Sequence, residues 1–214
     1  MQFYFFTSSV RVVIKVYKCA FYCRYLSIIF DAMDQSKCNV PHFKERPKEW
    51  QGCSQKLQMQ YGAFIVHGHG TYGIAFDERV KKDGDLWTTS LLHIILDLYN
   101  EYKAKGRKWP ERLYLQADNA SDNKNMAMYA LCQLLRDLGI FKVVKFCCLP
   151  VGHTHEDIDA CFGALARQLN GQNILTMDQV EALWRKGWPS LKSFHLVTVI
   201  YYLIVCIFRA SFLE

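Results

Sequence analysis

Residues 24–31 read Arg-Tyr-Leu-Ser-Ile-Ile-Phe-Asp, a run of β-branched and aromatic residues that stops at a carboxylate. Such a run is typical of a buried strand, and we expect one that ends at Asp31. Residues 112–118 read Arg-Leu-Tyr-Leu-Gln-Ala-Asp and predict a second short strand, which ends at Asp118. How these two strands are placed relative to one another decides the fold.

The sequence between and after these strands predicts a hairpin and several further elements. The hairpin has strands at 56–67 and 72–76 joined by Gly68-His69-Gly70-Thr71, because a strand follows this glycine-rich turn where a dinucleotide site would need a helix. Residues 35–54 are rich in proline and charge and are expected to form a loop. Apolar spacing predicts helices at 87–105, 126–138, 154–169 and 176–186, and a strand at 141–149.

This order of elements predicts a ribonuclease H-like α/β fold. Short connections and right-handed crossovers place the strand at 112–117 parallel to the strand at 24–31 and beside it. We expect a mixed five-stranded sheet, with three antiparallel strands followed by two strand–helix units, flanked by helices. The domain is expected to cover residues 24–187, between a divergent N-terminal extension at 1–23 and a divergent apolar tail at 188–214.

The composition excludes a disordered chain and limits the kinds of partner that the protein is expected to bind. Of 214 residues, 51% are hydrophobic and 21% are charged, and the net charge of +6 allows a nucleic-acid partner without requiring one. Nine cysteines, none in a Cys-x-x-Cys pair, favour free thiols and an intracellular location. The uncharged run at 194–208 is shorter than the roughly 20 residues of a spanning helix. A buried strand or helix, or an unrelated tail, is favoured there over a membrane segment.

Acidic residues stand at the ends of the predicted elements. Asp31 and Asp118 end two parallel strands, and Glu156 lies in the first turn of the helix at 154–169, with Asp157 and Asp159 close by. Carboxylates brought together repel unless a cation lies among them. Two Mg²⁺ or Mn²⁺ ions about 3.5–4 Å apart can hold the attacking and leaving oxygens of a phosphodiester. We therefore predict Asp31, Asp118 and Glu156 as catalytic and metal-binding residues, with Asp157 and Asp159 as alternatives for the third acid.

Other polar residues near these acids are assigned supporting or binding roles. Asn119, His153 and His155, together with Asp157 and Asp159, are predicted to orient the carboxylates or the start of the helix. The loop after Asp31 carries four cations that are candidates for phosphate contacts with DNA, namely Lys37, Lys44, Arg46 and Lys48. The ordinary alternative is that each of these groups caps a helix or faces water.

The stretch from His153 to Asp157 also fits His-x-His-x-Asp, the start of a metallo-β-lactamase zinc motif. The motif then continues with Ile158-Asp159 in place of the expected Asp-His, and only His195 follows. Too few ligands remain, so a zinc-dependent hydrolase that uses His153, His155 and Asp157 is kept as a minor alternative.

Three blocks of this sequence resemble an uncharacterised family of transposon-derived, integrase-like proteins. They are Asp-Ala-Met-Asp-Gln-Ser-Lys at 31–37, Leu-Gln-Ala-Asp-Asn-Ala-Ser-Asp-Asn-Lys-Asn at 115–125 and Val-Gly-His-Thr-His-Glu-Asp-Ile-Asp at 151–159. The third block is the most specific, and the resemblance runs from about residue 24 to 187. Ala32 stands where the family usually has Gly, and Asp122 where it usually has Glu.

The resemblance implies an integrase-like catalytic core with the Asp-Asp-Glu arrangement of transposases, carried here by Asp31, Asp118 and Glu156. It implies metal-dependent phosphodiester hydrolysis or strand transfer on DNA, and a nuclear location. The competing hypothesis is a domesticated, catalytically inactive module that has kept the fold for nucleic-acid or protein binding. The sequence does not indicate an oligomeric state.

Overall fold

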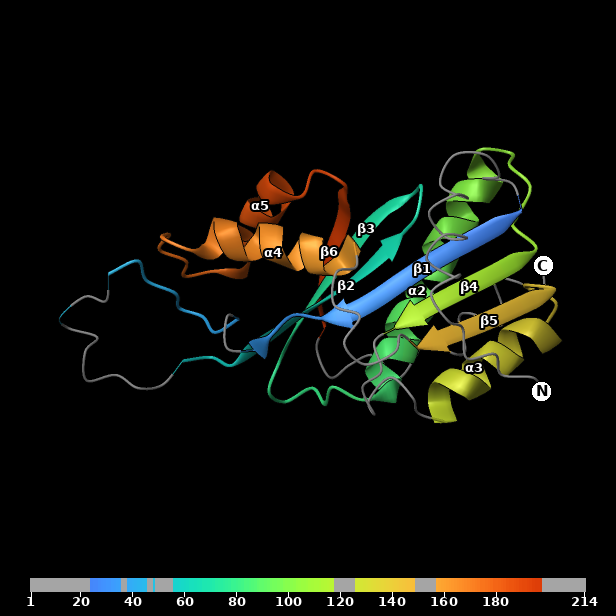
Figure 1. Cartoon of the computed structure of the whole chain (residues 1–214), viewed down its shortest axis with the longest axis horizontal. Helices are drawn as coiled ribbons and strands as arrows, with labels where there is room; N and C mark the ends of the chain where they lie inside the picture. Colours follow the sequence, from blue (N-terminus) through green and yellow to red (C-terminus); the bar gives the residue numbers. More distant parts are fainter. Residues whose placement is uncertain are drawn as a thin grey trace.

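The computed structural model describes residues 24–35, 38–45, 48, 56–117, 126–148 and 157–197 (Figure 1). The strands are β1 (Tyr25–Ala32), β2 (Met59–Val66), β3 (Gly70–Asp77), β4 (Arg112–Ala117), β5 (Val143–Cys148) and β6 (Leu191–Val197). The helices are α2 (Gly84–Ala104), α3 (Met126–Asp137), α4 (Asp157–Leu169) and α5 (Met177–Gly187).

All six strands form one mixed sheet in the order β5-β4-β1-β2-β3-β6. The strand β2 is antiparallel to both β1 and β3, whereas β4 is parallel to both β1 and β5. In the β1–β4 pair, Tyr25 lies opposite Arg112 and Phe30 lies opposite Ala117. The predicted ribonuclease H-like fold, with its first and fourth strands adjacent and parallel, is therefore confirmed.

The prediction of five strands is wrong by one. Residues 191–197, placed by sequence in the apolar tail, form β6, which runs parallel to β3 at the far edge of the sheet. The segment carries Lys192, Ser193 and His195 among its apolar residues, so it lacks the pattern of a buried strand and is held mainly by pairing with a distant strand. Within the part of the chain that the structure describes, no helix is long and apolar enough to cross a membrane.

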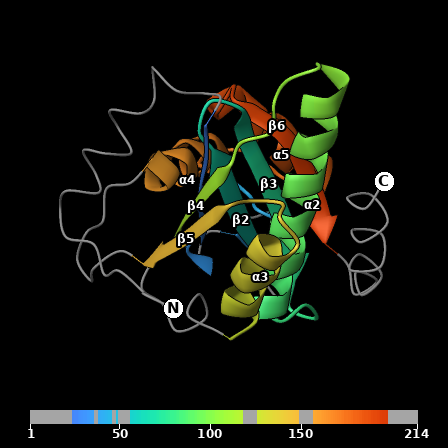
Figure 2. The same ribbon diagram turned by 90° about the vertical axis from the view of Figure 1, so that its right-hand side faces the viewer.

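Two cores lie on opposite faces of the sheet. One core lies between the sheet and helices α2 and α3, and the other lies under α4 and α5 (Figure 2). Side chains of β1 alternate between them: Ile28 and Phe30 belong to the α2 face, whereas Ile29 and Met33 belong to the α4 face. Because this alternation has a period of two, Asp31 lies on the α4 face.

Local signals set the helix and strand ends. The helix predicted at 87–105 begins three residues earlier, at Gly84, where the side chain of Asp83 accepts hydrogen bonds from the N–H groups of Asp85 and Leu86. Thr176 caps α5 in a capping box with Gln179. The hairpin between β2 and β3 is also confirmed, and Gly68 takes a positive φ of 83° in its turn.

Candidate active site at the ends of β1 and β4

Asp31 is the predicted catalytic residue that the structure describes. It is half-buried near the carboxyl end of β1, and its Oδ1 accepts a hydrogen bond of 2.7 Å from the N–H of Ala32. The neighbouring strand β4 ends at Ala117, opposite Phe30, and adjacent strands lie about 4.8 Å apart. The sequence continues from Ala117 to Asp118, and Asp118 lies outside the described residues, as do Asn119, His153, His155 and Glu156.

The start of α4 is tied to the sheet by a histidine that the sequence analysis did not single out. The Oδ2 atom of Asp157 lies 3.5 Å from Nε2 of His67, and Nδ1 of His67 lies 3.0 Å from the hydroxyl oxygen of Ser27. The backbone N–H of His67 also donates to the carbonyl of Ser27, at 2.9 Å. The antiparallel register of β1 with β2 explains the contact with Ser27, because Ile28 lies opposite Val66 and His67 directly follows β2.

This contact fixes where α4 begins relative to Asp31. Ser27 and Asp31 share the α4 face of β1 and are four residues apart, or about 13 Å at 3.3 Å per residue. Asp157 is thus held toward the amino end of β1, whereas Asp31 lies toward its carboxyl end. Asp159, in the same first turn, is exposed, and both acids suit the positive end of the helix dipole.

The described part of the basic loop is attached to the other end of α4. The backbone N–H of Lys44 donates to Oδ1 of Asn173 at 3.0 Å, and the backbones of His42 and Ile174 pair at 2.7 and 2.9 Å. Residue 173 follows α4, a 13-residue helix about 20 Å long. Lys44 and Lys48 are both exposed, and Lys37 and Arg46 lie outside the described residues. The loop therefore lies about one helix length from the start of α4.

No group of three or more His, Cys, Asp or Glu side chains that could hold a metal ion occurs among the described residues. Of the predicted triad, these residues include Asp31, whereas Asp118 and Glu156 lie outside them. For the zinc alternative, the structure describes Asp157 and His195 but neither His153 nor His155. His195 and Asp157 lie on opposite faces of the sheet, so His195 cannot complete a zinc site with Asp157.

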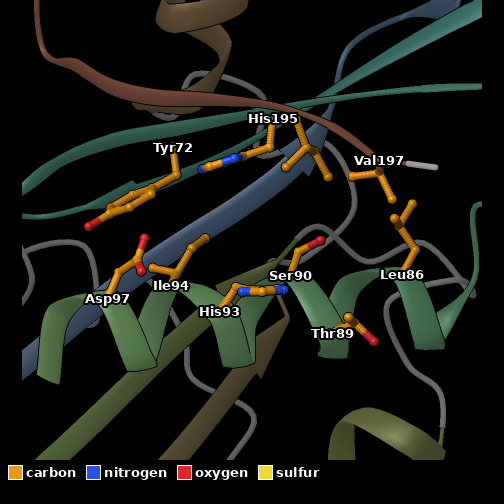
Figure 3. A pocket seen from close by; sticks show the side chains of 10 residues that line it. Tyr72, Leu86, Thr89, Ser90, His93, Ile94, Asp97, His195 and Val197 are labelled. Carbon is orange, nitrogen blue, oxygen red and sulfur yellow. The ribbon is translucent and has the colours of Figure 1, made fainter. Parts of the chain in front are cut away.

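His195 instead lines a cavity of about 150 Å³ between α2 and the strands β3 and β6 (Figure 3). Tyr72 and His93 lie on its walls, together with Asp97 (Figure 3). Burial lowers the pKa of His93, an effect that Asp97 opposes and His195 strengthens. The cavity opens on the α2 side of the sheet, so it is separate from Asp31.

Comparison with solved structures supports the fold. The catalytic domain of Mos1 mariner transposase superposes with a TM-score of 0.51 at 11% identity, over 89% of this chain and 86% of that one. The Mos1 strand transfer complex aligns at 12% identity and a TM-score of 0.47, over 95% of this chain and 57% of that one. The Mos1 paired end complex with Mn aligns at 12% identity and a TM-score of 0.49, over 84% of this chain and 52% of that one. At such low identity the first likeness shows a shared fold alone.

Sequence comparison gives a family and no characterised relative. No curated protein matches this sequence. A family model matches residues 51–203, which include every described element except β1. By this match, the chain belongs to the family described as "Domain of unknown function (DUF7869)".

Proposed function

We propose that this chain is the catalytic core of a transposase-derived enzyme that cleaves or joins phosphodiester bonds in DNA with divalent metal ions. The observation that carries the proposal is the parallel pairing of β1 and β4, with Phe30 opposite Ala117. In the sequence, Asp31 directly follows Phe30 and Asp118 directly follows Ala117, so we expect these two acids from distant parts of the chain at the same end of the sheet. The likeness to a transposase catalytic domain agrees with this proposal.

The chemistry of these side chains fits Mg²⁺ or Mn²⁺. Both ions prefer hard oxygen ligands, which carboxylates supply, and rigid strand ends are suitable platforms for them. We propose that Asp31, Asp118 and Glu156 would hold these ions. When bound, the ions would lower the pKa of the attacking water or 3′-hydroxyl and neutralise the charge that develops on the phosphate.

The chain's own residues then have defined tasks. The N–H of Ala32 orients the Asp31 carboxylate through its 2.7 Å hydrogen bond to Oδ1. His67 and Ser27 hold Asp157, and through it the first turn of α4, against the sheet. Asp157 is therefore assigned a positioning role, and Glu156 stays the proposed third ligand.

The test is nicking of supercoiled plasmid DNA by the full chain in the presence of Mg²⁺ or Mn²⁺. Asp31→Asn keeps the oxygen that accepts from Ala32 but removes the charge. We expect at least a hundredfold loss of rate, because metal binding contributes several kcal/mol, or roughly 10²- to 10³-fold, to such reactions. The matched control is Asp137→Asn at the exposed end of α3, which should nick like the parent chain. Equal nicking by the Asp31 and Asp137 variants would refute the proposed site.

A second candidate is a module that binds nucleic acid without cleaving it. It is favoured by the contact between His67 and Asp157, because this contact holds the start of α4 toward the amino end of β1, about 13 Å along the strand from Asp31, whereas a two-ion site needs acids that share closely spaced ions. DNA binding by the parent chain without metal-dependent nicking, at any Mg²⁺ or Mn²⁺ concentration, would select this candidate.

A further inference from the structure

Two tyrosines and two cations share one face of β1, β4 and β5. Tyr25 lies opposite Arg112 across the β1–β4 pair, and Tyr114 lies opposite Lys145 across the β4–β5 pair. Tyr25 is two residues before Ser27, and Ser27 pairs with Tyr114. Because side chains alternate along each strand, all four project from the sheet on the same side. We call Tyr25, Tyr114, Arg112 and Lys145 the tyrosine–cation face.

The two tyrosines contact each other, and each cation contacts one of them. The ring centroids of Tyr25 and Tyr114 are 5.7 Å apart. The guanidinium carbon of Arg112 lies 5.4 Å from the centroid of the Tyr25 ring, and Nζ of Lys145 lies 5.8 Å from the centroid of the Tyr114 ring. Arg112 is exposed, and the other three are half-buried. Cation–π contacts at these distances hold each cation beside its ring.

This face continues the surface on which Asp31 lies. Tyr25, Ser27 and Asp31 all project from the α4 side of β1, by the same alternation that places Ile29 in the core under α4. Helices α4 and α5 pack on the part of the sheet that contributes Ile29, Tyr61 and Ile65 to this core. Strands β4 and β5 lie on the other side of β1 from those helices (Figure 1).

The charge of this face favours a polyanion as its binding partner. Its positions on β4 and β5 are Arg112, Tyr114, Gln116, Val143, Lys145 and Cys147, and none of them is acidic. Cations attract phosphates, and aromatic rings accept unpaired bases by stacking, a combination that is typical of surfaces that bind single-stranded nucleic acid. Bases inside a duplex are already stacked on one another and cannot use the rings in this way.

We propose that the tyrosine–cation face binds unpaired nucleotides of a DNA strand, with bases stacked on Tyr25 and Tyr114 and phosphates held by Arg112 and Lys145. This inference rests on the proposed function in one respect: the bound DNA strand would run along the face on which Asp31, a proposed catalytic residue, lies. It differs from the four cations of the 37–48 loop, which the sequence alone favours as the DNA contact.

The experiment measures binding of a fluorescent single-stranded oligonucleotide to the full chain by anisotropy, in EDTA so that no cleavage takes place. Tyr25→Leu and Tyr114→Leu are each expected to weaken binding at least fivefold, because they remove a stacking ring but keep an apolar side chain. Tyr114→Phe keeps the ring and should bind like the parent chain. Arg112→Gln and Lys145→Gln should each reduce the slope of log K against log salt by about 0.7. Lys103→Gln, at an exposed position of α2, should leave the slope unchanged.

Several results would overturn this proposal. They are no binding of the oligonucleotide by the parent chain, equal binding by Tyr114→Leu and Tyr114→Phe, or a duplex bound as tightly as the single strand. A tyrosine variant that fails to fold, as judged by circular dichroism, leaves the salt slopes of the two cation variants to decide. Loss of nicking in Asp31→Asn with unchanged oligonucleotide binding in the tyrosine variants would overturn this inference alone. Unchanged nicking in Asp31→Asn with weaker oligonucleotide binding in the tyrosine variants would overturn the proposed catalytic site alone.

Discussion

Replacement of Trp184 by alanine should cost more stability than most single changes in this domain. Its side chain is fully buried in the core under α4 and α5. Its ring centroid lies 6.2 Å from that of Tyr61, 6.3 Å from that of Phe162 and 5.8 Å from that of Phe194. The indole N–H also donates to the sulfur of Cys161 at 3.4 Å. One side chain thus joins α5 to β2, α4 and the late strand β6.

The size of the effect follows from this burial. Removing a buried tryptophan side chain costs about 3–5 kcal/mol through lost transfer energy and the cavity left behind. Domains are stable by only about 5–15 kcal/mol, so Trp184→Ala should remove a fifth or more of the total. Trp184→Phe keeps a ring against Tyr61 and Phe194 and should lose less. The control is Leu175→Ala, a large-to-small change at a side chain that is 57% exposed, which should stay within about 0.5 kcal/mol.

Urea unfolding followed by circular dichroism measures these differences. A fall in the midpoint at constant m-value reports lost stability rather than a change in the unfolded chain. A Trp184→Ala loss below about 1 kcal/mol would refute the packing described here, and with it the placement of α5 and β6 in this domain.

Two further changes test other parts of the fold. Glu101 on α2 pairs with Lys105 and also with Lys192 at the start of β6, and these contacts lower its pKa from 4.5 to about 2. A carboxyl whose pKa is depressed in the folded state stabilises above its unfolded pKa, so its contribution is present above about pH 5 and is lost as the pH falls toward 2. Glu101→Gln should cost about 1 kcal/mol at pH 7, because solvent screens these pairs, and much less at pH 2, where about half of the carboxyl groups are protonated; an equal cost at both pH values would contradict the pairing. A methyl group at Gly62 would lie 2.9 Å from atoms of Ile74 and of the buried Trp87. Gly62→Ala should therefore cost about 1–3 kcal/mol of stability in the same urea assay. An unchanged stability would contradict this close contact.

The sequence predicts the centre of the sheet well because the signals there are local. The run from Leu26 to Phe30 is apolar except at Ser27, as expected for a strand with both faces largely buried, and Thr176 is a helix cap that acts over three residues. The adjacent, parallel placement of β1 and β4 follows from short connections and from the right-handedness of crossovers, which is nearly universal between parallel strands. These features together give the ribonuclease H-like order.

Features that depend on distant contacts are harder to predict. The strand β6 contains exposed polar residues, and its pairing with β3 depends on a partner more than a hundred residues earlier. The contact between His67 and Asp157 likewise joins the end of the hairpin to the start of α4, and no spacing rule connects them. The tyrosine–cation face becomes visible only when the register of β1, β4 and β5 is known, because Tyr25, Tyr114 and Lys145 form no motif along the chain.

Calorimetric titration of the full chain with Mn²⁺ is the direct test of the proposed metal site, since it counts bound ions without requiring turnover. We expect two bound ions per chain, loss of at least one in Asp31→Asn and in Asp118→Asn, and full binding in Asp137→Asn. A parent chain that binds no Mn²⁺, or an Asp31→Asn chain that binds as many ions as the parent with equal affinity, would contradict the proposed metal site.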